Sequence, residues 1–385
     1  MKKVAIDLRG LNYKYHNGVN IYTLFLLKCL YEIKNIYPFH LTAIGLNKKT
    51  QRKLNQSNSY FKKVIDSHLT TSKYLNLPNL NNFYTNFFLL SKYLTNKNLL
   101  NNNIQKFDKV ILPQPKILNF HPKSEVLTVF HDIFGILGYN STGIKQRILE
   151  NKAIFGSLVT HSKQIWGNSM STCNDLQEYL KAPPSKIKLV YPALWQNQKI
   201  AQNQKKTQSY YVAISGIEPR KNWYNLILAH HYCNQTFEGF DMDLVLIGRV
   251  VDSKYYKKLQ KLIQKYSINN IEFVIDAKDS KKNQLLSNCA FTVYPSYWEG
   301  FGYPILESLA YDKPIITSKI SSMPELAKDS AVYINPLNSK EIATAIYLLY
   351  SDREYYKKLV HNCPNNLRYF NQEEVQKKIK EFIFG

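Results

Sequence analysis

The sequence has few acidic residues, few cysteines and no long apolar run, and each shortage excludes a class of protein. Its 385 residues hold 28 Asp and Glu against 51 Lys and Arg, a formal net charge of +23, so anionic partners are favoured: nucleic acid, an acidic membrane or a phosphorylated substrate. Five scattered cysteines without a C-x-x-C pair indicate reduced thiols and argue against a zinc site. No run approaches the ~18 apolar residues of a membrane span, so we expect a cytoplasmic protein whose membrane contact is peripheral at most.

The opening of the chain also lacks two common signals. Charged Asp7 and Arg9 come before any long apolar stretch, which predicts a first strand rather than a signal peptide. The strand, loop and helix that begin the chain lack G-x-G-x-x-G, the dinucleotide fingerprint. A nicotinamide dehydrogenase is disfavoured as well, because Gly300-Phe301-Gly302 lies late in its domain, without a third glycine or a suitably spaced ribose acid.

The length and the pattern of elements predict two α/β domains. A chain of 385 residues exceeds one typical core, and short apolar runs alternate with helical patterns as in a parallel, doubly wound sheet. The predicted parts are a first domain at 1–195, a linker at 196–209, a second domain at 210–368 and a final helix within 369–385 that crosses back onto the first domain.

The most informative stretch runs from a predicted buried strand, 291–294, through a glycine-rich turn into a helix. Gly300 and Gly302 let backbone approach a ligand without a Cβ in the way, and Pro304 suits the first helical position. The start of the helix would offer N–H groups and a positive dipole end to an anion. This order of elements predicts an anion-binding turn.

Two acids flank the turn, Glu299 before the glycines and Glu307 about one turn into the helix. Carboxylates repel a phosphate, so they need another role, and accepting hydrogen bonds from sugar hydroxyls is the natural one. A backbone cradle for a diphosphate beside two sugar-binding acids suits a sugar nucleotide. Either acid alone is better explained as a favourable first-turn acid or a solvated turn residue.

The segment from Glu299 to Glu307, with Gly-Phe-Gly-x-Pro inside it, resembles the E-x7-E signature of retaining glycosyltransferase family 4. The resemblance implies the GT-B fold, with two Rossmann-like doubly wound domains facing a central cleft. It implies that Glu299 lies by the donor sugar and that Glu307 binds the ribose. The backbone expected to approach phosphate and sugar belongs to Gly300, Phe301, Gly302 and Tyr303. Tyr303 replaces a smaller aliphatic residue common in the family, which changes the expected pocket shape.

The turn from Gly216 to Asn222 follows a predicted strand, 210–215, and reads Gly-x-x-Pro-Arg-Lys-Asn. Two adjacent cations at the mouth of a strand-to-helix loop suit a diphosphate, although a lone Arg-Lys pair is usually solvated surface. The pattern resembles the family's donor-phosphate turn. The resemblance implies that Gly216 lies at the donor and that Arg220 and Lys221 stabilise charge on the departing diphosphate.

His131 and Asp132 follow a strong predicted strand, 126–130, at the edge where open α/β sheets present functional groups. A satisfied core histidine is the default, but the family places a histidine here in the interdomain cleft beside the donor sugar. His131 would then bond a sugar hydroxyl, and Asp132 would orient the ring or cap the loop. Gly18, in a predicted loop at 9–20, resembles a family glycine near donor phosphate or acceptor and is equally well explained as a turn glycine.

The sequence thus predicts a retaining, metal-independent hexosyltransferase whose nucleotide-sugar donor is a substrate, with no cofactor. The expected catalytic residues are Glu299, His131, Arg220 and Lys221, and no enzymatic nucleophile is visible. The His-Asp pair and the Glu-Pro-Arg-Lys-Asn turn look most like bacterial mannosyl- and rhamnosyltransferases of O-antigen, lipopolysaccharide or capsule assembly. GDP-mannose is the first expected donor, with a UDP- or dTDP-sugar as the alternative. A lipid-linked glycan acceptor at the cytoplasmic face of the inner membrane would agree with the positive charge.

Two other classes stay open. A nucleic-acid-binding protein is supported by charge and aromatic content alone, because no recognised module and no basic element is visible. Another GT-B enzyme, such as a nucleotide-sugar epimerase, would need further acid/base residues around the donor sugar. We expect a nucleotide sugar and a glycan as partners, and no nucleic acid.

Overall fold

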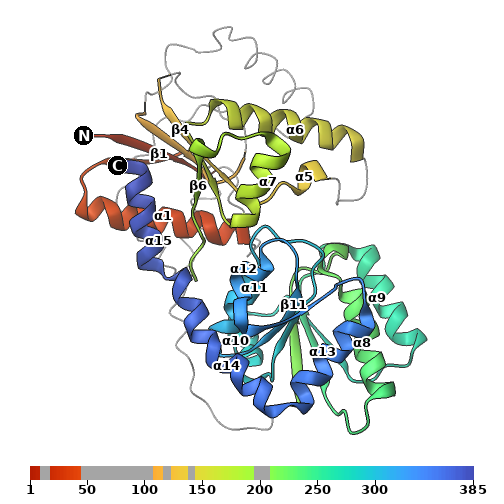
Figure 1. The fold of residues 1–385 in the computed structure, drawn as a ribbon. Helices are drawn as coiled ribbons and strands as arrows, with labels where there is room; N and C mark the ends of the chain where they lie inside the picture. The colour runs from red at the N-terminus through yellow and green to blue at the C-terminus, as the bar shows by residue number, and fades with distance from the viewer. Residues whose placement is uncertain (9–17, 45–106, 116–122, 138–143, 195–208) are drawn as a thin grey trace. The chain divides into compact units, whose positions relative to one another are not determined.

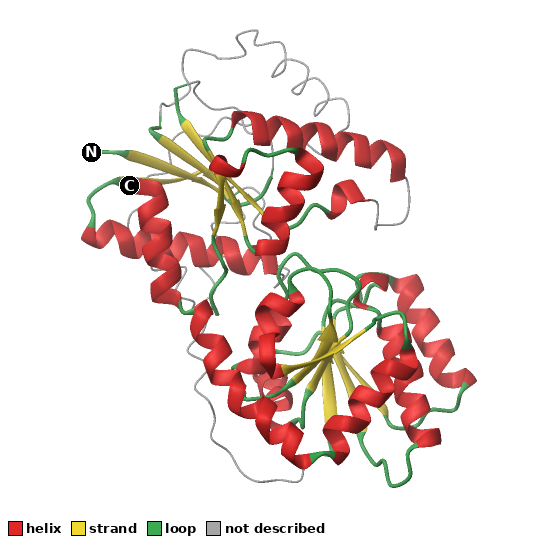
Figure 2. Ribbon diagram, in the orientation of Figure 1, coloured by secondary structure: helices red, strands yellow, loops and turns green. Residues whose placement is uncertain are grey.

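The computed structural model describes residues 1–8, 18–44, 107–115, 123–137, 144–194 and 209–385. All but the last residue of the predicted linker, and most of the predicted loop before the first helix, lie outside the described residues. The chain divides into two compact units, Met1–Trp195 with Gln372–Gly385, and Gln196–Asn371. Each unit contains one six-stranded sheet (Figures 1 and 2).

The sheet of the first unit has the strand order β2-β1-β3-β4-β5-β6, and all its pairings are parallel. Its order reverses beside β1, because the chain goes outward to β2 and then returns past β1 to β3. The strands are β1 (Lys3–Asp7), β2 (His40–Ile44), β3 (Lys109–Leu112), β4 (Glu125–Phe130), β5 (Gln164–Gly167) and β6 (Ile187–Leu189).

Helices cover both faces of this sheet. Val4 and Ile6 of β1 pack with α1 (Gly18–Ile36) and α15 (Gln372–Phe384), while Ala5 faces the opposite cluster. That second face is covered by α5 (Phe134–Leu137), α6 (Ile144–His161) and α7 (Met170–Leu180), and the short η1 (Pro184–Lys186) precedes β6. Burial of alternate residues on both faces explains the continuous apolar strands.

The first helix begins earlier than its sequence pattern suggests. Gly18 is the first residue of α1, although residues up to Asn20 were expected to form a loop. The expectation was wrong at this boundary because Val19 and Asn20 already belong to the helix, where Thr23 Oγ1 donates to the Val19 carbonyl at 2.8 Å. Gly18 therefore lies at a helix start.

The sheet of the second unit has the order β12-β11-β10-β7-β8-β9, again parallel throughout. Consecutive strands run outward from β7 to β9, and the chain then returns to β10 on the other side of β7. The bounds are β7 (Tyr210–Ile214), β8 (Asp243–Gly248), β9 (Ile271–Ile275), β10 (Thr292–Tyr294), β11 (Ile315–Ser318) and β12 (Ala331–Ile334).

Seven helices and three short 3-10 turns surround this sheet in the described chain. In Figure 1, α8, α9 and α13 lie to one side of the strands and α10, α11 and α12 to the other, while α14 contacts both α11 and α13. Their bounds are α8 (Trp223–Thr236), α9 (Ser253–Lys265), α10 (Asp279–Asn288), α11 (Tyr303–Leu309), α12 (Met323–Ala327), α13 (Ser339–Ser351) and α14 (Arg353–Leu367), with η2 (Pro219–Lys221), η3 (Lys328–Ser330) and η4 (Arg368–Phe370).

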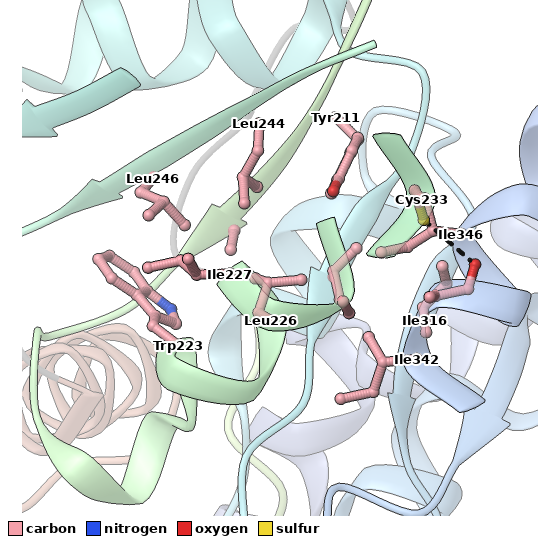
Figure 3. Close-up of a cluster of buried hydrophobic side chains, with 14 of the residues drawn as sticks. Tyr211, Trp223, Leu226, Ile227, Cys233, Leu244, Leu246, Ile316, Ile342 and Ile346 are labelled. Carbon is pink, nitrogen blue, oxygen red and sulfur yellow. Dashed lines mark hydrogen bonds between the residues drawn. The ribbon is translucent and has the colours of Figure 1, made fainter. Parts of the chain in front are cut away.

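The core under the α8 face is large and closely packed. Trp223, Leu226 and Ile227 of α8 lie against Leu244 and Leu246 of β8 (Figure 3). From the far side of α8, α13 adds further isoleucines, and the Cys233 thiol donates to the Ala343 carbonyl at 3.4 Å. Each of these buried apolar side chains contributes roughly 1.5–3 kcal/mol, so the sheet is a rigid base for the loops at its carboxyl edge.

The reversal of strand order selects one place on this edge. In open α/β sheets, ligands bind beyond the carboxyl ends of the strands where the order reverses. Here β7 and β10 are direct neighbours, with Val212 paired to Thr292. The loops that follow these two strands therefore emerge side by side.

No helix in the described ranges is long and apolar enough to cross a bilayer.

Candidate functional site

Backbone and amide bonds hold the loops after β7 and β10 together. Tyr297 N–H donates to the Arg220 carbonyl at 2.9 Å. Asn222 adopts a left-handed conformation, φ 58°, and its Nδ2 donates to the Pro295 and Pro336 carbonyls at 3.0 and 2.7 Å. Asparagine tolerates this conformation better than most residues, which accounts for its place at the end of η2.

A buried ion cluster lies where these loops meet. The Glu299 carboxylate accepts from Lys221 Nζ at 2.6 Å through Oε1 and from Arg220 at 2.7 Å through Oε2. Arg220 also donates to the Trp298 carbonyl at 2.8 Å and to Glu218 at 2.9 Å. Glu299 and Lys221 are only 5% and 9% exposed, so both charges depend on each other for solvation.

The pKa values in this cluster follow from burial and pairing. Burial alone would raise the pKa of Glu299, but Lys221 and Arg220 lower it to about 2. Burial opposes charge on Arg220 too, yet Glu299 and Glu218 raise its pKa. Burial lowers the pKa of Lys221, and Glu299 only partly compensates. Glu299 is therefore ionised at neutral pH, and its carboxylate favours the charged form of both Arg220 and Lys221.

Tyr294, the last residue of β10, is the second hydrogen-bond partner of Lys221. Its hydroxyl accepts from Lys221 Nζ at 2.9 Å, and burial raises the tyrosine pKa well above its usual value. A phenol that keeps its proton at neutral pH can accept from the ammonium without adding charge. Tyr294 therefore fixes where the Lys221 ammonium lies.

The turn before α11 depends on one glycine. Gly302 has φ 109° and caps α11, so a residue with a side chain would be strained there. Tyr303 is the first helical residue and Pro304 the second, which corrects the expectation that Pro304 comes first. Phe301 is buried and packs edge-on against Tyr303 at 5.3 Å between ring centroids.

Two serines hold the backbone of this turn. Ser321 Oγ accepts from Glu299 N–H at 3.0 Å, and Ser322 Oγ lies 3.0 Å from the Glu299 carbonyl and 2.6 Å from that of Phe301. Gly300 lies buried between these anchored residues. The backbone around Glu299 is thus fixed independently of its side chain.

Glu307 has a cation of its own. Its Oε1 accepts from Lys282 Nζ of α10 at 2.6 Å, and the Glu307 side chain is 15% exposed. Burial by itself would lower the pKa of Lys282, but the effect of Glu307 is larger, so the net shift of this pKa is upward.

In the loop after β7, Gly216 is half-buried, and an added Cβ would lie 2.8 Å from a methyl of Val251.

In the first unit, His131 follows β4 and lies against the residue that follows β3. Its Nε2 is 2.7 Å from the Pro113 carbonyl, and its ring lies edge-on to Tyr22 at 5.2 Å. Burial lowers the His131 pKa to about 4, so the ring is neutral at pH 7. A carbonyl can only accept, so Nε2 carries the proton and Nδ1 is left as an acceptor.

Asp132 caps the short helix that follows. Its Oδ1 accepts from Phe134 N–H at 3.0 Å, which is the loop-capping role that the sequence suggested as one of two. Nearby Asp175 of α7 is buried, and burial, with smaller effects from Glu178 and Asp132, raises its pKa to about 6. Repulsion between these carboxylates thus adds to the effect of burial on Asp175.

Comparisons with known proteins point to one family. Residues 196–366 match the family model described as glycosyl transferases group 1. The match covers 171 of the 385 residues, all of them in the second unit. The chain is 24% identical over 189 residues to the O-antigen chain mannosyltransferase RfbU of Salmonella typhimurium, covering 49% of this chain and 51% of that protein. An uncharacterized glycosyltransferase of Methanocaldococcus jannaschii is 23% identical over 373 residues, 96% of this chain and 95% of its own.

Solved structures agree on the fold. The Anabaena HepE protein, crystallised with UDP and glucose, superposes with a TM-score of 0.68 at 16% identity, covering 100% of this chain and 99% of its own. The predicted α/β fold with two doubly wound sheets of the GT-B kind is confirmed. The match to RfbU spans about half the length of that protein, 51%.

The structure places the predicted residues in two sets. Arg220, Lys221 and Glu299 form one buried cluster, with the glycine-rich turn directly after it. Glu307 lies four residues after Tyr303, the first residue of α11, and pairs with Lys282. Gly216 lies in the loop after β7. The other set, in the first unit, consists of Gly18, His131 and Asp132.

Sequence reasoning missed four contributors. Tyr294 was counted as a strand residue and Glu218 as turn sequence, yet both bond the cations directly. Lys282 has no motif around it, and Ser322, in the segment after β11, was not predicted as a site residue. In the described ranges no group of three or more His, Cys, Asp or Glu side chains is arranged to hold a metal ion.

Proposed function

We propose that the protein transfers a hexose from a nucleotide-sugar donor to a glycan acceptor and that the second unit binds the donor. The observation that carries this proposal is the meeting of Arg220, Lys221 and Glu299 at the strand-order reversal between β7 and β10. This pairs diphosphate-binding cations with an acid that can accept bonds from sugar hydroxyls.

The proposed roles follow the chemistry of each group. Arg220 and Lys221 bind the diphosphate and stabilise its growing charge as the bond to the sugar breaks. Glu299 accepts from hydroxyls of the sugar, and Glu307, oriented by Lys282, accepts from the ribose. The backbone of Gly300, Phe301, Gly302 and Tyr303 would lie along the donor, since the glycines have no Cβ to keep a ligand away from it. Transfer with retention and without a metal stays part of this proposal.

The roles of the first unit remain predictions. His131 is suited to accept a bond from a sugar hydroxyl through Nδ1, because Nε2 is occupied by the Pro113 carbonyl. Its neutral ring excludes a role as a resident cation. Asp132 would keep the loop after β4 in place, and Gly18 would let a ligand approach the start of α1.

GDP-mannose is the proposed donor. Similarity to the mannosyltransferase RfbU, and to the O-antigen chain mannosyltransferase B of Escherichia coli at 27% identity over 140 residues, supports it. The second candidate is a UDP-sugar, favoured by the UDP and glucose bound to HepE. The proposed acceptor is a lipid-linked glycan, because a net charge of +23 attracts both an anionic bilayer and a diphosphate linkage.

Thermal unfolding of the full chain with GDP-mannose, UDP-glucose, a dTDP-sugar and a short single-stranded DNA tests the proposal. A ligand at ~100 times its dissociation constant adds roughly 2.7 kcal/mol. We expect GDP-mannose to raise the Tm of the wild type and of Lys261→Ala, which removes an exposed lysine of α9. The shift should vanish in Lys221→Ala and shrink in Glu307→Ala.

Each other result has a defined meaning. A shift with UDP-glucose alone would make the donor a UDP-sugar and the mannose assignment wrong. A shift with DNA alone would favour a nucleic-acid-binding protein. Equal shifts in the wild type and Lys221→Ala would reject the ion cluster as the donor site. Transfer of radiolabelled sugar to a lipid-linked glycan extract then measures activity directly.

A further inference from the structure

Both cations of the ion cluster are already paired with the Glu299 carboxylate. Both carboxylate oxygens of Glu299 are bonded, one to Lys221 at 2.6 Å and the other to Arg220 at 2.7 Å. Phosphate oxygens are acceptors of the same kind for ammonium and guanidinium groups. Glu299 thus makes the contacts that a diphosphate would make with these two cations.

The charges of the cluster reinforce this point. Glu218 and Glu299 pair with Arg220 and Lys221, so each basic side chain already has a carboxylate partner. A diphosphate added to this arrangement would meet cations whose charge is already compensated and would approach two carboxylates. Binding becomes favourable once one carboxylate has moved away. Glu299 is the candidate because it contacts both cations, whereas Glu218 contacts Arg220 alone.

The backbone of the turn is held by bonds that do not involve the Glu299 carboxylate. Ser321 Oγ accepts from the Glu299 N–H and Ser322 Oγ lies by the Glu299 carbonyl, both at 3.0 Å. The Lys221 ammonium also donates to the Tyr294 hydroxyl, at 2.9 Å. A rotation of the Glu299 side chain therefore leaves both the turn and the lysine in place.

We infer that Glu299 occupies the diphosphate position in the nucleotide-free protein, and that an arriving nucleoside diphosphate exchanges its oxygens for this carboxylate on Lys221 and Arg220. This inference rests on the proposed function. It makes sugar recognition conditional, because the Glu299 carboxylate becomes available to sugar hydroxyls only after the diphosphate has replaced it. It also predicts that the wild type binds nucleoside diphosphates more weakly than its cations alone would allow.

The two cations hold the Glu299 carboxylate firmly, because they lower its pKa to about 2 although burial opposes this shift. The displaced carboxylate regains hydration and sugar contacts, which offset part of the loss of these ion pairs. We expect the Glu299→Gln variant, which cannot pair ionically with the cations, to bind GDP or UDP at least tenfold more tightly than the wild type.

Isothermal titration calorimetry of GDP and of UDP into the full chain at pH 7 measures this effect in the wild type, Glu299→Gln, Glu218→Gln and Lys221→Ala. Glu218→Gln is the matched control, because it removes the same charge from the same cluster without freeing Lys221. We expect it to tighten binding less than threefold, and Lys221→Ala to abolish binding. Circular dichroism at the titration temperature checks that each variant is folded.

The outcomes separate this inference from the proposed function. If Glu299→Gln binds the nucleotide as the wild type does or more weakly, and Lys221→Ala does not bind it, the exchange is rejected. The assignment of the donor site then still stands. Equal tightening in Glu218→Gln and Glu299→Gln rejects it as well, because general charge then explains the gain. If neither nucleotide binds the wild type, or Lys221→Ala binds as the wild type does, the donor site itself is wrong.

Discussion

The stability of the second unit should depend on the charge of Glu299. Its pKa lies about 2.5 below the ordinary 4.5, and at about 1.4 kcal/mol for each pH unit its ionised form stabilises the fold by about 3 kcal/mol at pH 7. Because the folded-state pKa is the lower one, this contribution is present above pH 4.5 and is lost as the pH falls toward 2. At pH 3 it amounts to about 1.4 kcal/mol.

The perturbation is Glu299→Gln, which keeps the size and removes the charge. For a unit of this size, about 3 kcal/mol lowers the Tm by roughly 6–12 °C at pH 7. Urea unfolding at pH 3, 4, 5 and 7, followed by circular dichroism, should show the gap between wild type and variant widening by about 2 kcal/mol from pH 3 to pH 7.

Glu218→Gln serves as the control for this measurement. The Glu218 side chain is 23% exposed and contacts Arg220 alone, so its loss should cost under about 1 kcal/mol. Equal stability of wild type and Glu299→Gln at pH 7 would refute the reasoning. So would a difference that is large but the same at pH 3 and pH 7, because it would come from packing and not from the charge.

Two further predictions concern single residues. Gly302→Ala places a Cβ at φ 109°, so we expect a loss of about 1–3 kcal/mol in urea unfolding, and no loss would mean that the turn does not need this conformation. Asp175→Asn should stabilise the first unit by up to about 3 kcal/mol at pH 7 and not at all below pH 3.8. In the folded protein the pKa of Asp175 is raised to about 6, so its ionisation lowers the free energy of unfolding as the pH rises from 3.8 to 6. A variant less stable than the wild type at pH 7 would contradict this.

Much of the fold follows from patterns that are local in the chain. Runs such as Val126 to Phe130 are apolar because parallel strands are buried on both faces, and the helices between them bury one face each. Boundaries are less predictable, because tertiary contacts extend elements beyond their apolar core. The extension of α1 back to Gly18 is an example. The strand orders also required the structure, since local patterns do not say which strands become neighbours.

The candidate site was predictable in its residue types and not in its pairings. Turns that carry Arg220, Lys221, Glu299 and Glu307 have distinctive spacing, and the structure places the first three together. Their partners, however, are set by contacts between residues 78 and 79 positions apart. The bond from Lys282 to Glu307 joins a helix without a motif to one with a motif. Such contacts depend on strand order, which local sequence does not encode.

The buried charges themselves indicate function rather than stability. A buried ion pair is often no more stable than apolar side chains of the same volume, and Lys221 remains so desolvated that its pKa is lowered even beside Glu299. The large apolar core beneath the sheet can offset this cost, and it holds the loops of β7 and β10 in one register. Two acids expected to contact a donor each pair with a lysine, Glu299 with Lys221 and Glu307 with Lys282. Each carboxylate thereby orients the lysine that it contacts, which a purely stabilising core would not require.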